Sequence, residues 1–151
     1  MDRFVLCVVG MKTEQDIDAL TERVIGCAIE VHRTLGPGLL ESIYRDCMVI
    51  ELRGSGIRVA RERFVAIDYK GHPLDAPLKI DLLVEGELVI EIKAVEALHP
   101  IHQAQVITYL KLSGCPSGLL LNFNAPTLRA GLKRLDHPDR YAKKKAARES
   151  A

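Results

Sequence analysis

Hydrophobic residues recur at helical spacing along the first third of the chain. Over residues 17–35 they repeat every three to four positions, and Thr13 with Asp16 supplies the polar pair that typically opens a helix. Gly36-Pro37 interrupts this repeat, and a second one covers residues 39–52. Because glycine and proline end helices, the pattern predicts two amphipathic helices in succession.

The middle of the chain changes to strand-like runs. Residues 57–60, 64–69 and 79–94 are rich in β-branched and aliphatic residues, with a turn at Lys70-Gly71. A helical repeat returns over about residues 100–112, and the continuous apolar run 118–123 is typical of a buried strand. The order helix, helix, strands, helix, strand predicts an α/β (α+β) fold in which a mixed β-sheet is flanked by helices.

The length and composition fit a single globular domain. The 151 residues are 48% hydrophobic and 27% charged, a balance that allows a sizeable core. We predict a domain at residues 13–135, an N-terminal extension at 1–12 and, at 136–151, a basic tail that is disordered because it has nothing to bury. With 21 basic and 20 acidic residues, the net charge does not by itself indicate a nucleic-acid partner.

Membrane segments and paired cysteine motifs are both missing from the sequence. No apolar run reaches the ~18 residues of a membrane helix, so we expect no membrane partner. The four cysteines, Cys7, Cys27, Cys47 and Cys115, are widely separated. We interpret them as free thiols of a cytoplasmic protein, and neither as disulfides nor as a metal site.

Three charged residues interrupt the apolar pattern of segment 79–94, KIDLLVEGELVIEIKA. Asp81, Glu91 and Lys93 stand among residues that normally fill a core, where unpaired charges are costly. Side chains alternate between the two faces of a strand, and a three-residue loop at 84–86 would place all three charges on one face. The opposite face would then carry Ile80, Leu82, Ile90 and Ile92 into the core.

Two carboxylates and an ammonium group on one face are chemically complementary. Hard oxygen ligands suit Mg²⁺ or Mn²⁺, which bind phosphate oxygens and activate water. Lys93 follows Glu91 by two positions, points the same way and could orient that water. The alternative is a half-exposed antiparallel strand whose charges are merely solvated, and the pattern alone leaves both interpretations open.

The spacing of these charges resembles the signature of the PD-(D/E)XK nuclease superfamily. In Asp81-(x)9-Glu91-x-Lys93, Ile80 replaces the proline of the signature, which is not a metal ligand. The predicted order of elements also matches this superfamily. The resemblance implies a restriction-endonuclease-like αβββαβ core and a hydrolase, an Mg²⁺- or Mn²⁺-dependent nuclease, that acts on phosphodiester bonds, foremost in DNA and otherwise in RNA.

Two flanking motifs extend the resemblance over residues 24–134. GLLESIY at 38–44 fits the GxxExxY pattern, which names a family of small prokaryotic proteins in this superfamily. Gln105 and Tyr109, four positions apart on the predicted third helix, resemble the QxxxY motif of the RecB-like branch. The three motifs occur in the order, and on the elements, that the resemblance requires.

The resemblance also implies catalytic and metal-binding roles. Asp81 and Glu91 would bind the metal together with the backbone carbonyl of Ile92. Lys93 would position the attacking water and stabilise developing charge. Glu41 resembles a helix acid that reaches the same site in many members, although its place in the sequence is equally compatible with a surface residue.

Further residues are candidates for contacting the substrate or bracing the site. Gln105 and Tyr109 share one helix face and would do either; the alternatives are a solvated glutamine and a tyrosine packed on the sheet. Tyr44 would brace the site from the core. His32 would approach the site or cap helix carbonyls, and His102, at a predicted helix start, is a candidate for phosphate contact.

Two classes of function fit these residues. The first is a nuclease whose partner is nucleic acid, foremost DNA. The second is a non-catalytic nucleic-acid-binding or assembly module on the same fold. An oxidoreductase is disfavoured because the sequence has no glycine-rich dinucleotide loop. The choice between a monomer and a homodimer is left open.

Overall fold

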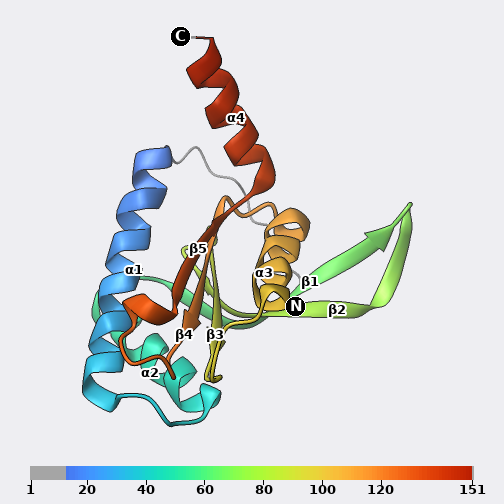
Figure 1. The fold of residues 1–151 in the computed structure, drawn as a ribbon. Helices are drawn as coiled ribbons and strands as arrows, with labels where there is room; N and C mark the ends of the chain where they lie inside the picture. Colours follow the sequence, from blue (N-terminus) through green and yellow to red (C-terminus); the bar gives the residue numbers. More distant parts are fainter. Residues whose placement is uncertain (1–12, 151) are drawn as a thin grey trace.

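One five-stranded β-sheet with helices on both faces forms the body of the protein (Figure 1). The computed structural model describes residues 13–150, so the predicted extension at 1–12 lies outside the described residues. The strands lie in the order β1-β2-β3-β4-β5; β3 and β4 run parallel, and the other neighbouring pairs run antiparallel. The predicted mixed sheet flanked by helices is confirmed.

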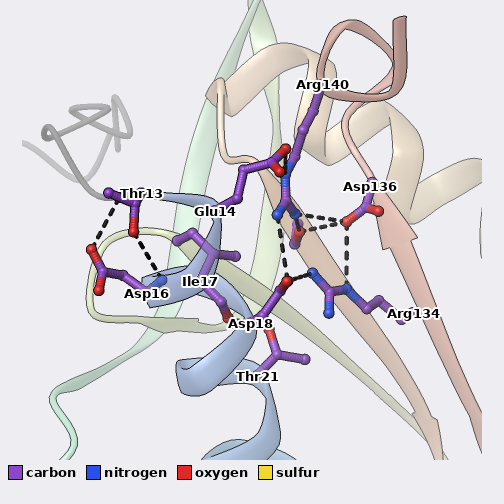
Figure 2. Close-up of polar contacts among 10 residues, drawn as sticks. Thr13, Glu14, Asp16, Ile17, Asp18, Thr21, Arg134, Asp136 and Arg140 are labelled. Carbon is purple, nitrogen blue, oxygen red and sulfur yellow. Dashed lines mark hydrogen bonds and ion pairs between the residues drawn. The ribbon is translucent and has the colours of Figure 1, made fainter. Parts of the chain in front are cut away.

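Helices α1 (Glu14–Leu35) and α2 (Glu41–Gly54) form a pair that covers one face of the sheet (Figure 1). The predicted start of α1 is confirmed. The Thr13 hydroxyl accepts a hydrogen bond from the Asp16 N–H, and the Asp16 carboxylate accepts one from the Thr13 N–H (Figure 2). The apolar stripes of both helices pack on strand residues such as Ile90, and this burial holds the pair on the sheet.

The first two strands form a long hairpin that extends beyond the rest of the sheet (Figure 1). They are β1 (Val59–Tyr69) and β2 (His72–Val84). The segments predicted at 57–60 and 64–69 are joined in β1, where Glu62 takes a positive φ of 49°. Strand β3 (Leu88–Lys93) follows, and of β2 only the end next to their connecting loop pairs with it.

Helix α3 (Pro100–Ser113) connects the parallel strands β3 and β4 (Ser117–Asn122) and covers the second face of the sheet. Every residue of β4 is buried, as its apolar run predicted. Gly118 permits the close approach of α3, because a Cβ atom there would lie 2.8 Å from Cγ1 of Val106. The run from α2 to β4 has the expected αβββαβ order.

The 3₁₀ turn η1 (Arg129–Gly131) and strand β5 (Leu132–Asp136) end the predicted domain. Most of the tail predicted at 136–151 forms helix α4 (Pro138–Glu149), where a disordered segment was expected. Arg140 fixes the first turn of α4: its guanidinium donates to Asp136 at 3.0 Å and to Asp18 of α1 at 3.4 Å (Figure 2). The polar composition of the tail indicated disorder because the sequence does not show which charged residues become ion-pair partners in space.

Hydrophobic clusters fill both faces of the sheet. Leu82, Ile90 and Ile92 pack toward α1 and α2, as predicted. Ile80 instead joins Tyr109 of α3 in the cluster on the other face, so its prediction is wrong. That prediction depended on regular alternation, and the hairpin is irregular here: Glu62, which lies between the β1 partners of Leu82 and Ile80, takes a positive φ.

The cysteines follow the prediction only in part. Cys27 and Cys47 carry free thiols, but Cys115 is disulfide-bonded. The prediction of free thiols is therefore wrong for Cys115, since spacing along the chain does not reveal which cysteines become neighbours in space. Within the described part of the chain, no helix is both long and apolar enough to cross a bilayer.

Candidate active site

The pairing of β2 with β3 brings Asp81 and Glu91 together. Leu82 pairs with Ile90, so positions 81 and 91 come next in the same register. The charge of the Asp81 carboxylate raises the pKa of the Glu91 carboxyl, so the two groups lie within electrostatic range of each other. The two acids therefore meet on one face, the face that α3 covers.

A three-residue connection, residues 85–87, sets this register. The loop predicted at 84–86 has the correct length but is displaced by one residue. Glu85 and Gly86 both adopt left-handed backbone conformations, with φ of 51° and 66°. Because the number of loop residues is unchanged, the acids still share a face.

Asp81 takes the place of part of the backbone ladder between β2 and β3. Its Oδ2 accepts a hydrogen bond of 2.9 Å from the N–H of Ile92, where a regular antiparallel pair would use a backbone carbonyl. Its Oδ1 lies 3.7 Å from Nη2 of Arg45 in α2. Only 8% of the residue is exposed, so the carboxylate is held between the strands with few alternative orientations.

Glu91 lies in surroundings that oppose its ionisation. The residue is 5% exposed, and burial raises the pKa of its carboxyl to about 8; the charge of Asp81 adds to this rise and that of Lys93 counteracts it. Nζ of Lys93 is 3.6 Å from Oε1. Oε2 is buried and has no hydrogen-bond partner within residues 13–150. An unpaired buried acceptor is costly, so the site would gain from a cation or a donor at this oxygen.

Strand β4 fixes the position of Lys93. The N–H of Phe123 donates to the Lys93 carbonyl at 2.9 Å. The side chain of Asn122 accepts from the N–H of Val95 at 3.0 Å and donates to its carbonyl at 2.9 Å. These bonds hold the chain where it leaves β3. The sequence analysis missed Asn122, although a polar residue at the end of an apolar strand is a usable signal.

Helix α3 brings Tyr109, but not Gln105, to the carboxylates. Tyr109 is buried, and burial together with the charges of Glu91 and Asp81 raises the pKa of its hydroxyl to about 12. The side chain of Gln105 is exposed, and no hydrogen bond joins it to Lys93 among the described residues.

The first turn of α3 also borders the site. His102 Nδ1 accepts from the N–H of His99 at 3.0 Å, and His99 Nδ1 accepts from the N–H of Ile101 at 3.2 Å. Burial and the charges of Lys93 and His99 lower the pKa of His102, while the charge of Glu41 acts in the opposite direction. His102, Lys93 and Glu41 thus lie within electrostatic range of one another.

The GLLESIY segment builds the turn that delivers Glu41 to α2. Gly38 has a φ of 103°, a conformation that favours glycine. The Tyr44 hydroxyl donates to the Gly36 carbonyl at 2.6 Å and accepts from the N–H of Leu39 at 3.1 Å. Glu41 is the first residue of α2 and is half-buried. Tyr44 therefore stabilises the turn before α2, and its hydroxyl bonds to this turn and not to the paired carboxylates.

His32 makes its contacts away from the paired carboxylates. Its Nε2 lies 2.8 Å from the carbonyl oxygen of Ala125, in the loop after β4. Its ring stacks on Phe123 with a centroid distance of 6.5 Å, and Phe123 stacks in turn on Tyr44 at 4.6 Å. This stack ties α1, α2 and the end of β4 together, which favours the bracing role over substrate contact.

Arg45 is a residue of the site that the sequence analysis missed. It lies one turn after Glu41 on α2 and contacts both Asp81, at 3.7 Å, and Glu62 of β1, at 3.3 Å. Residues four apart share a helix face, so the position of Glu41 could have indicated it. The acids therefore have two positively charged neighbours: Arg45 lies beside Asp81, and Lys93 lies beside Glu91.

The donors at this site fit a hard divalent cation. Asp81 and Glu91 offer neighbouring carboxylates, and Glu91 Oε2 lacks a partner among the described residues. Within the described part of the chain, no three His, Cys, Asp or Glu side chains cluster in a way that could hold a metal ion. A cation would therefore need backbone, water or phosphate oxygens to complete its shell, as Mg²⁺ commonly does.

Comparison with known proteins agrees with this geometry. A family model described as the PD-(D/E)XK nuclease superfamily matches residues 18–135, which include Asp81, Glu91 and Lys93. No curated protein matches the chain. The match covers well over half of the 151 residues, and the mixed sheet with its αβββαβ order agrees with it. The chain therefore belongs to the PD-(D/E)XK nuclease superfamily.

Proposed function

We propose that this protein is a metal-dependent nuclease that hydrolyses phosphodiester bonds, foremost in DNA. The observation that carries the proposal is the pair of buried, adjacent carboxylates, one with an unpartnered oxygen, beside Lys93. A fold has no need for two neighbouring carboxyl groups in its core, whereas a divalent cation would stabilise both of them in the ionised form.

In this proposal Asp81 and Glu91 hold Mg²⁺ or Mn²⁺, with the backbone carbonyl of Ile92 as a third ligand. The bound ion supplies positive charge and an acidified water. Lys93 orients the attacking water and stabilises the charge that develops on the phosphate. Its Nζ stands beside Oε1 of Glu91, which supports this division of roles.

The surrounding residues are assigned to the substrate and to positioning. Glu41 borders the site from α2, and Tyr109 from α3 excludes water from the carboxylates. Gln105, exposed one turn earlier, is assigned to the substrate. Tyr44 and His32 are positioning residues that hold the elements around the site.

Finer points of classification are also proposals. The turn geometry of the GLLESIY segment supports membership of the GxxExxY family, since Gly38 and Tyr44 both have a physical role there. The boundaries of the catalytic domain at residues 13 and 135 remain predictions, as does the choice between a monomer and a homodimer.

The second candidate is a non-catalytic module that binds nucleic acid or assembles with a partner. The observation in its favour is that no three candidate metal-ligating side chains cluster within residues 13–150. Such a module would bind nucleic acid in the absence of divalent cations and would never cleave it.

A cleavage assay separates the two candidates. Single-stranded and duplex DNA and RNA are each incubated with protein in Mg²⁺, Mn²⁺ or EDTA, and Asp81→Asn protein purified in the same way serves as the control for contaminating nucleases. We expect cleavage by the wild type with Mg²⁺ or Mn²⁺ and none with EDTA. Binding without cleavage under every condition would favour the module.

A further inference from the structure

Arg45 stands between the proposed metal ligand Asp81 and Glu62 of β1. Its Nη2 lies 3.7 Å from Asp81 Oδ1, and its Nη1 lies 3.3 Å from Glu62 Oε1. Its Nε is buried and has no hydrogen-bond partner among the described residues, whereas 21% of the side chain is exposed. The arginine is therefore partly enclosed, incompletely bonded and still in contact with solvent.

The contact between Arg45 and Asp81 is an ion pair and not a hydrogen bond. A separation of 3.7 Å exceeds the usual N–H···O range of about 2.7–3.2 Å. Asp81 Oδ2 is already engaged by the N–H of Ile92, so Oδ1 is the oxygen that faces the guanidinium. A stronger competitor for Oδ1 can displace Arg45 without breaking a hydrogen bond.

The site has no excess negative charge while no cation is bound. Even with both carboxylates ionised, Asp81 and Glu91 are already matched by the side chains of Arg45 and Lys93. A divalent cation at the carboxylates would add two positive charges and repel the guanidinium at close range. The site would then attract an anion, and the planar fork of arginine matches two oxygens of a phosphate.

We infer that Arg45 is a phosphate-binding residue that neutralises Asp81 until a divalent cation takes its place there. The inference rests on the proposed nuclease function. Glu62 is the second partner of the guanidinium and keeps it near the site after the exchange. The ligand of Arg45 is a phosphate group of the nucleic-acid strand that the cation also contacts.

A purely structural arginine would give different results. If Arg45 only tied α2 to β2, its loss would destabilise the protein and would leave cation affinity unchanged or weaker. A counter-ion that competes with the cation has the opposite effect, because its removal makes the carboxylates more available to Mn²⁺. The direction of the change in Mn²⁺ affinity therefore distinguishes the two roles.

Calorimetry and anisotropy test the exchange. Mn²⁺ is titrated into wild type, Arg45→Gln, Arg45→Lys and Lys79→Gln protein, and binding of a fluorescent DNA duplex, with RNA of the same sequence in parallel, is then measured in Ca²⁺. For Arg45→Gln we expect Mn²⁺ binding to tighten about tenfold and nucleic-acid binding to weaken about tenfold, with a salt slope reduced by about one. Arg45→Lys should keep the Mn²⁺ affinity of the wild type and lose part of the nucleic-acid affinity, since an ammonium group lacks the fork.

Lys79 is the matched control. It also contacts Glu62, at 3.7 Å, and carries the same charge, but no ion pair joins it to Asp81 among the described residues. Lys79→Gln should change Mn²⁺ affinity by less than about twofold. Unchanged or weaker Mn²⁺ binding by Arg45→Gln, or undiminished binding of nucleic acid, would overturn the inference and leave the proposed function standing. A wild type that binds no Mn²⁺ would overturn both.

Discussion

Two clusters of charged side chains, at different places on the sheet, are arranged in opposite ways. The cluster of Figure 2 joins Asp18, Arg134, Asp136 and Arg140, and each acid faces arginine. The cluster at β2 and β3 sets two acids against each other inside the fold. The hydrogen bond from Arg134 is the main cause of a lowered pKa for Asp18, whereas burial raises that of Glu91 to about 8.

The two clusters differ in their effect on stability. The charges of Figure 2 stabilise the fold, whereas the buried acid at Glu91 is unfavourable when it is ionised. In the Figure 2 cluster the ionised forms favour each other, and the result is an ordered α4 and a tie between α1 and β5. At Glu91 the fold opposes ionisation, and the surrounding core strands supply the stability that keeps the two acids there. A charge that costs stability calls for a functional explanation.

The largest effect is expected for Lys93→Ala. Removing the group that stabilises developing charge should lower the single-turnover cleavage rate by on the order of a hundredfold to a thousandfold. The fold and most of the Mn²⁺ affinity should persist, because Lys93 is not a proposed metal ligand. The rate is compared with that of Lys79→Ala, a lysine outside the site. Equal rates for the two variants would remove Lys93 from the mechanism.

The dependence of stability on pH is expected to differ in sign between the two clusters. In the absence of cation, an unfolded chain releases the Glu91 proton near pH 4.5, while the folded protein keeps it up to about pH 8. The folded state therefore binds more protons in this window, and the free energy of unfolding should fall by on the order of 1 kcal/mol per pH unit as the pH rises. Urea denaturation in EDTA across this range measures the slope, and Glu91→Gln should remove it.

Asp18 provides the comparison for that experiment. Its lowered pKa means that its contribution to stability is present above its ordinary pKa of 3.8 and is lost as the pH falls below that value. Asp18→Asn should therefore leave the slope between pH 4.5 and 8 unchanged and reduce only the loss of stability in acid. A wild type whose stability is flat between pH 4.5 and 8 would contradict the assignment of Glu91.

A divalent cation should stabilise the protein through the acids of β2 and β3. At a hundredfold excess over its dissociation constant, Mn²⁺ should raise the free energy of unfolding by about 2.7 kcal/mol, seen as a higher melting temperature. Asp81→Asn should abolish this increase and should leave the cation-free protein no less stable, because the amide oxygen can still accept from the N–H of Ile92 and, where Glu91 is ionised, the repulsion between the two carboxylates is lost. A clearly destabilised Asp81→Asn together with a wild type indifferent to Mn²⁺ would mean that these charges serve the fold.

The smallest effect is expected for Arg140→Ala. The arginine side chain is only 10% exposed and bonds Asp136, Asp18 and Ser117, so its loss should cost about 1 kcal/mol of stability. Amide hydrogen exchange in α4 should accelerate, while cleavage stays at the wild-type rate. Arg148→Ala, an exposed position on the same helix, is the control. Exchange that is equally fast in both variants would show that Arg140 does not anchor α4.

Local patterns predicted most elements because they depend on neighbouring residues alone. The capping pair Thr13 and Asp16, the glycines after α1 and α3, and the apolar run of β4 each set a boundary to within a residue or two. The errors occurred where distant contacts decide the outcome. α4 depends on ion pairs from Arg140 to α1 and β5, and the departure of Ile80 from its predicted face accompanies an irregularity at Glu62 in the neighbouring strand.

The sequence by itself determined which chemistry is available: two acids and a lysine spaced for one face of two adjacent strands, in an order of elements that limits the fold. Only the tertiary structure decided how those groups behave. The register places Asp81 Oδ2 against the N–H of Ile92, and α2 brings Arg45 beside Oδ1 of the same carboxylate. Burial beneath α3 raises the pKa of Glu91. Alternation and spacing are properties of a local chain, whereas burial and electrostatic environment arise only when distant elements pack together.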